Sequence, residues 1–184
     1  MRRPDEQKAI NSVFEVLQNE GLNPIEDPSI QDNPDCVFEL RGKRVAADCT
    51  NFNLEALLKW SNSTKRIEKE KQYEIKFALE PHYWIKESIE AKVDKISTYK
   101  ANGDAEEVWL IAHALEIPEL FDCNDSIINI MQDAIRFLQP TFEEVWFIHH
   151  QYPVKRLWRK GDPAVPNFPS WDTPKDKYPF EQII

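Results

Sequence analysis

Glycine is scarce in this 184-residue chain, which has only four glycines and contains neither GxGxxG nor GxxxxGK[ST]. Loops that bind dinucleotides or nucleoside triphosphates through glycine-rich turns are therefore disfavoured. Cysteine is also rare, and the three thiols, Cys36, Cys49 and Cys123, form no CxxC pair. An odd number of thiols without paired spacing argues against a disulfide framework and a four-thiolate zinc site, and favours a reducing compartment.

Long apolar runs are missing as well. No segment approaches the roughly 20 apolar residues of a membrane span. The N-terminus becomes polar at once and lacks the apolar core of a signal peptide. We therefore expect a cytoplasmic protein with no membrane partner.

Basic residues are outnumbered by acidic ones. The chain has 23 Lys and Arg against 32 Asp and Glu, a net charge of -9. Proteins that bind the phosphate backbone of nucleic acids over a large surface usually carry a basic face. The negative net charge of this chain therefore argues against such an extended binding surface. It leaves room for a local basic groove beside acidic metal ligands.

The pattern of elements predicts an α/β domain with a mixed central sheet flanked by helices. At this length we expect one domain, residues 1–160, followed by a proline-rich tail, 161–184, that packs on it. Residues 21–34 are expected to form a loop that contains at most one short strand. Helices are expected at 4–21, 54–60, 63–72, 83–100 and 126–138, and strands at 36–40, 43–50, 73–79, 108–112, 144–149 and 154–158.

The hairpin between residues 34 and 50 carries the candidate chemistry. If Arg41-Gly42 is a two-residue turn, the register sets Asp35 opposite Asp48 on one face of the sheet. Two carboxylates this close are costly without a cation between them. Together with a backbone carbonyl, they are the hard oxygen ligands that suit Mg²⁺, and such an ion can activate a water for attack on a phosphodiester. The same register sets Glu39 opposite Arg44 as an expected ion pair.

Pro34-Asp35, the hairpin and Asp48-Cys49 resemble the motif of the PD-(D/E)XK, or restriction-endonuclease-like, superfamily. That motif is Pro-Asp, a hairpin of variable length, then Asp or Glu, any residue, and Lys. Thr50 stands where the lysine belongs. The resemblance covers about residues 4–113 in element order. It implies a nuclease that hydrolyses DNA with Mg²⁺ or Mn²⁺ held by Asp35, Asp48 and the backbone carbonyl of Cys49, with a homodimer as one option.

Lys92 is the candidate for the displaced lysine. Some members of the superfamily with Thr in the motif move the lysine to a helix of this kind, and the role is carried over on that resemblance. Lys92 lies in an expected apolar stripe with Ile89 and Tyr99, where a charge is expensive unless it reaches a polar site. No acid lies three or four residues away, so its partner should come from another element.

A further acid in this superfamily often comes from the first helix. Glu6 lies one turn before Ile10 on the inward stripe, and the resemblance makes it a supporting acid or a ligand of a second metal ion. As an acid in the first turn of a helix, Glu6 is also favoured by the helix dipole alone.

Other interpretations stay open. Thr50 and the acidic charge favour a degenerate nuclease fold that has lost catalysis and serves as a binding or assembly module. Asp35 and Asp48 could have only turn and capping roles. A cysteine or histidine hydrolase would require Cys49 and His113 within hydrogen-bond reach.

Overall fold

The computed structural model describes residues 2–30, 32–51, 81–115, 123–150 and 152–169. The elements expected at 54–60, 63–72 and 73–79 lie outside these residues, as does the tail beyond residue 169. In the described part, no helix is long and apolar enough to cross a membrane.

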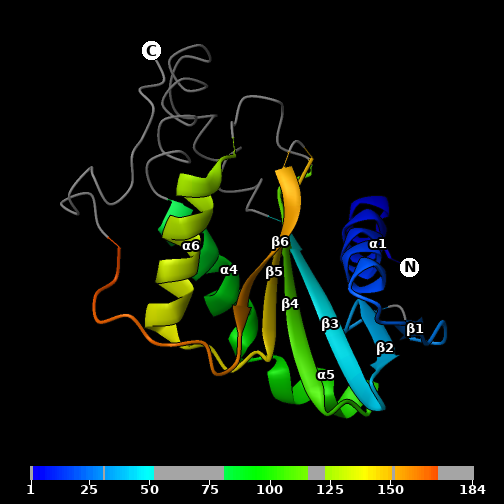
Figure 1. The fold of residues 1–184 in the computed structure, drawn as a ribbon. Coiled ribbons are helices and arrows are strands. Elements are labelled where there is room, and N and C mark those ends of the chain that lie inside the picture. Colours follow the sequence, from blue (N-terminus) through cyan, green and yellow to red (C-terminus); the bar gives the residue numbers. More distant parts are fainter. Residues whose placement is uncertain (1, 31, 52–80, 116–122, 151, 170–184) are drawn as a thin grey trace, which may run out of the picture.

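A mixed sheet forms the centre of the domain, as the sequence predicts. Within the described residues it has six strands, which lie side by side in chain order (Figure 1). The central strands β3, β4 and β5 run parallel, and the outer pairs β1–β2, β2–β3 and β5–β6 run antiparallel. The strands are β1 (Ile25–Glu26), β2 (Cys36–Leu40), β3 (Lys43–Asn51), β4 (Glu107–His113), β5 (Glu144–His149) and β6 (Tyr152–Arg159).

Helices cover both faces of the sheet. The first helix, α1 (Pro4–Asn19), packs on one face, which we call the α1 face. The opposite face, which we call the α4 face, is covered by α4 (Pro81–Val93), α5 (Ile96–Gly103) and α6 (Asp125–Leu138) (Figure 1). Alternation along the strands explains the division, since successive side chains point to opposite faces. In β2 and β3, Val37 and Ala46 belong to the core of the α4 face, whereas Phe38 and Ala47 belong to that of the α1 face.

The hairpin between β2 and β3 has the predicted register. Arg41 and Gly42 both have positive φ, 55° and 74°, as a two-residue type I′ turn requires. The strand pairing includes Glu39 with Arg44, but the expected ion pair between them is wrong. Arg44 instead contacts Asp27 at 2.7 Å and the carbonyl of Gly103 at 2.6 Å. Its long side chain reaches past the strand to acceptors on the loop after β1 and at the end of α5.

The single helix expected over residues 83–100 is also wrong. The chain makes a tight turn at Asp94 and Lys95, where the Lys95 amide donates to the Lys92 carbonyl at 3.0 Å. Aspartate favours local backbone contacts outside helices, which makes this a suitable place for a break. The break separates α4 from α5, and α5 lies at the lower end of the sheet in Figure 1, with Tyr99 buried in the core.

Candidate functional site

The chain just before β2 is held by two distant side chains, and this positions Asp35. Asn102, in α5, donates to the backbone carbonyl of Asn33 at 2.8 Å. Arg2, before α1, donates to the backbone carbonyl of Asp35 at 2.8 Å and pairs with Glu26 at 2.7 Å. The backbone that carries the Asp35 side chain is therefore held by residues from both halves of the chain.

The carboxyl of Asp35 reaches across to β3. Its Oδ2 accepts a hydrogen bond from the backbone amide of Cys49 at 2.7 Å. In a strand the amide and the carbonyl of one residue point to the same side, so the Cys49 carbonyl also points toward the β2 side. The register continued from Cys36 and Ala47 sets Cys49 opposite Pro34, which has no N–H to donate to that carbonyl. A carboxylate and a backbone carbonyl oxygen therefore lie on the same side of the end of β3.

Asp48 lies in β3 and pairs with Leu110 in the middle of the sheet. It is 4% exposed, and its Oδ2 lies 2.6 Å from the ammonium of Lys92 in α4. The prediction that the partner of Lys92 comes from another element is confirmed. Tyr99, from α5, is buried close enough for its hydroxyl to be affected by the charge of Asp48. Burial and the carboxylate of Asp48 raise the pKa of Tyr99 well above its usual range, so the hydroxyl stays protonated and remains a donor.

The two acids affect each other. Burial, then the negative charge of Asp48, raise the pKa of Asp35 to about 7, with a smaller contribution from Glu6. The Cys49 amide and the charge of Lys92 act in the opposite direction but do not compensate. A like charge nearby disfavours ionisation of Asp35, and a cation at the site would favour it. Sequence register alone had predicted this pair of neighbouring carboxyls.

Glu6 has a different set of contacts. Its Oε2 accepts from the backbone amide of Arg3 at 2.8 Å, and its Oε1 lies 2.8 Å from the guanidinium of Arg3. This is the return half of a capping box at the start of α1. The charge of Glu6 is felt at Asp35, but both of its oxygens are engaged at the helix terminus. Its role as a metal ligand stays a prediction.

The alternative of a cysteine or histidine hydrolase is not supported by the geometry. The thiol of Cys49 faces the backbone carbonyl of Glu6 at 3.9 Å, and His113 Nε2 lies 3.7 Å from Asp5 Oδ2. Burial raises the pKa of the Cys49 thiol well above its usual value and lowers that of His113 to about 4. A thiolate paired with an imidazolium is therefore disfavoured on both sides.

The donor set suits Mg²⁺ or Mn²⁺. In the described residues, no group of three or more His, Cys, Asp and Glu side chains is arranged to hold a metal ion. Mg²⁺ does not need such a group, because it keeps several waters and binds through one or two carboxylates. Asp35, Asp48 and the Cys49 carbonyl provide oxygen donors only, and the raised pKa of Asp35 marks a local deficit of positive charge.

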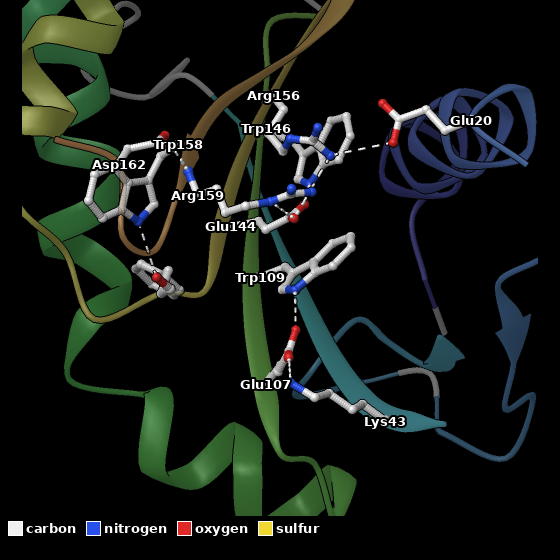
Figure 2. Close-up of polar contacts among 11 residues, drawn as sticks. Glu20, Lys43, Glu107, Trp109, Glu144, Trp146, Arg156, Trp158, Arg159 and Asp162 are labelled. Atoms are coloured by element: carbon white, nitrogen blue, oxygen red, sulfur yellow. Dashed lines mark hydrogen bonds and ion pairs between the residues drawn. The ribbon is translucent and has the colours of Figure 1, made fainter. Parts of the chain in front are cut away.

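A second group of acids lies on the α1 face where β4 and β5 begin (Figure 2). Glu107 accepts from the indole of Trp109 at 3.3 Å and from Lys43 at 2.6 Å. Glu144 accepts from the indole of Trp146 at 2.9 Å and from Arg159 at 2.9 Å (Figure 2). A pocket of about 580 Å³ borders these groups. Each of these two acids already has an indole donor and a cation, so neither of them requires a further cation.

No family model, curated protein or solved structure matches the chain. The site therefore has to be interpreted from its own residues. Sequence reasoning found Asp35, Asp48 and Lys92 but missed Arg2 and Asn102, whose side chains hold the backbone just before β2. No local pattern marks these contacts, because they join residues more than 30 positions apart.

Proposed function

We propose that this protein is a metal-dependent nuclease of the PD-(D/E)XK type that hydrolyses DNA phosphodiester bonds with Mg²⁺ or Mn²⁺. The observation that carries the proposal is the convergence of Asp35 and Asp48, from the two adjoining arms of one hairpin, with Lys92 on Asp48. The order of α1, the hairpin, α4 and the central strand β4 supports a restriction-endonuclease-like core. The choice of DNA comes from family analogy alone.

The residues have distinct roles in this proposal. Asp35, Asp48 and the Cys49 carbonyl would hold the cation, which would supply Lewis acidity for attack by water on the phosphodiester. Lys92 is 20% exposed at its side chain and lies at the rim of the site, where its ammonium can contact a phosphate oxygen and stabilise the charge that develops there. Thr50 lies two residues beyond Asp48 on the same face of β3, and in this proposal the lysine that the motif lacks there comes from α4.

The protein is proposed to act in the cytoplasm, and a homodimer stays a prediction. All three cysteines are free, which agrees with a reducing compartment.

The test is cleavage of plasmid DNA and of a single-stranded oligonucleotide by the purified chain, with Mg²⁺, Mn²⁺ or EDTA. We expect cation-dependent cleavage that falls by about 10³-fold in Asp48→Asn and Asp35→Asn. Asp27→Asn is the matched control, because Asp27 pairs with Arg44 outside the site, and its cleavage rate should equal that of the wild type. Cleavage that survives EDTA or Asp48→Asn would overturn the proposal.

A second candidate is a non-catalytic binding or assembly module with the same fold. The net charge of -9 and the close contact between Lys92 and Asp48, which gives this acid a cation of its own, favour it. It predicts no cleavage with any cation and a melting temperature that does not change when Mn²⁺ is added.

A further inference from the structure

Arg2 places a guanidinium among three segments of the chain. Its side chain is 5% exposed, and each of its three nitrogens faces a different oxygen. Nη1 donates to Oε1 of Gln7 in α1 at 2.6 Å, and Nη2 lies 2.7 Å from Oε1 of Glu26 in β1. Nε donates to the backbone carbonyl of Asp35 at 2.8 Å. A planar guanidinium with three such contacts is held in one orientation, so it fixes the place of that carbonyl.

The backbone at Asp35 needs this contact because the sheet does not hold it. The regular pairing of β2 with β3 begins at Cys36 and Ala47, so Asp35 lies just outside the ladder. Its carboxylate nevertheless reaches the backbone amide of Cys49 in β3 at 2.7 Å. A shift of the Asp35 backbone would move this carboxylate relative to Asp48.

The three contacts of Arg2 also differ in what they do for packing. Those with Gln7 and Glu26 join α1 to β1. The contact with Asp35 is not needed to join elements, because β2 is already paired with β1 and with β3 in the sheet. Its effect is therefore local, on the residue that carries one acid of the candidate site.

We propose that Arg2 is a positioning residue, which holds the backbone of Asp35 so that the carboxylates of Asp35 and Asp48 can bind one divalent cation. The inference rests on the proposed function and adds to it a residue that precedes α1. Mg²⁺ requires nearly ideal geometry, so a displaced ligand lowers its affinity. Removing a group that orients a metal ligand typically weakens metal binding by about 10- to 100-fold.

The test uses the full chain without DNA. Binding of Mn²⁺ is followed by electron paramagnetic resonance of the free ion, for the wild type, Arg2→Met, Arg2→Lys and Asp48→Asn. We expect Arg2→Met to raise the dissociation constant of Mn²⁺ about 10-fold. Arg2→Lys keeps the charge beside Glu26 but loses the planar set of donors, so it should also bind Mn²⁺ more weakly, and it decides the test if Arg2→Met does not fold.

Cleavage assays provide a second measurement. The Mn²⁺ concentration for half-maximal rate should rise by the same factor as the dissociation constant. The KM for DNA and the rate at saturating Mn²⁺ should equal those of the wild type, because Arg2 acts only through the placement of Asp35.

Arg44→Met is the control. Arg44 also joins a carboxylate and a backbone carbonyl, those of Asp27 at 2.7 Å and Gly103 at 2.6 Å, and both contacts lie outside the site. Removing its guanidinium should leave Mn²⁺ binding unchanged. All variants are also melted in EDTA, so that an effect on stability is separated from an effect on the cation.

The outcomes separate this inference from the proposed function. If the wild type binds Mn²⁺, Asp48→Asn does not, and the Arg2 variants bind as the wild type does, the role of Arg2 is overturned and the nuclease proposal stands. A lower melting temperature of the Arg2 variants with unchanged Mn²⁺ affinity has the same meaning. An equal loss of affinity in Arg44→Met would also overturn the role of Arg2, because it would show a general loosening of the sheet. If the wild type does not bind Mn²⁺, both proposals fail.

Discussion

Two groups of acids lie on this sheet, and their partners differ. On the α1 face, Glu107 pairs with Lys43 and Glu144 pairs with Arg159, and each also accepts from an indole. On the α4 face, Asp48 has Lys92, but among the described residues no lysine or arginine pairs with the carboxylate of Asp35. Both groups include a partly buried acid with a raised pKa, Glu144 and Asp35.

Glu144 and Asp35 differ in the charged groups that offset the cost of burying each carboxylate. Burial raises the pKa of Glu144, while Arg156 and Arg159 act to lower it, so two cations of its own region offset part of the cost of burial. The pKa of Asp35 is raised by burial and by a second acid, and the Cys49 amide and the charge of Lys92 offset only part of this, so the remaining compensation would come from a further cation or a proton. The number of acids is therefore the same in kind on both faces, and the cations beside each buried acid make the difference.

The largest expected effect is that of Lys92→Met. Removing one partner of a buried ion pair costs about 3–5 kcal/mol, because Asp48 is left buried and unpaired. In EDTA the melting temperature should fall by about 10 °C. Cleavage should be lost, and added Mn²⁺ should raise the melting temperature of Lys92→Met more than that of the wild type. An equal response of both proteins to Mn²⁺, measured by calorimetry, would show that no cation takes the place of the ammonium.

A smaller, pH-dependent effect is expected for Asp35→Asn. The pKa of Asp35 is raised from 3.8 to about 7 in the folded protein, so the folded state holds a proton that the unfolded state has released. This group therefore lowers the stability of the metal-free protein as the pH rises from about 4 to about 7. Asparagine cannot ionise, so the variant should gain about 5 °C over the wild type at pH 8 and much less at pH 4.

The measurement is thermal melting of both proteins in EDTA across this pH range. Comparing the two removes the contributions of all other titrating groups. A constant difference between them would contradict the raised pKa of Asp35.

The smallest effect is expected for Lys43→Met on the α1 face. The Lys43 side chain is 56% exposed, against 20% for Lys92, although both ion pairs have the same length of 2.6 Å. Exposed ion pairs contribute little because water screens the charges. We expect a change in melting temperature below about 2 °C and no change in cleavage or Mn²⁺ binding. A fall in melting temperature as large as that of Lys92→Met would contradict the claim that the ion pair on the α1 face contributes less to stability than the one on the α4 face.

The hairpin shows what local sequence can predict. Alternation of side chains and the turn at Arg41 and Gly42 set the register, and the register places Asp35 beside Asp48. The strands β4, β5 and β6 and the helices α1 and α6 were predictable for the same reason, since their apolar spacing is strong. Arg44 shows the limit of local prediction. Its strand neighbour, Glu39, was predicted correctly, but its ion-pair partner, Asp27, was not.

By itself the sequence determined that two acids of one hairpin lie together, because turn geometry and a side-chain period of two act over a few residues. Tertiary structure decided what surrounds those acids. Lys92 of α4 pairs with Asp48, and Asn102 of α5 holds the backbone carbonyl of Asn33 just before Asp35. These two contacts join residues more than 40 positions apart. Only the packing of α4 and α5 against the sheet fixes them, and no local pattern specifies that packing.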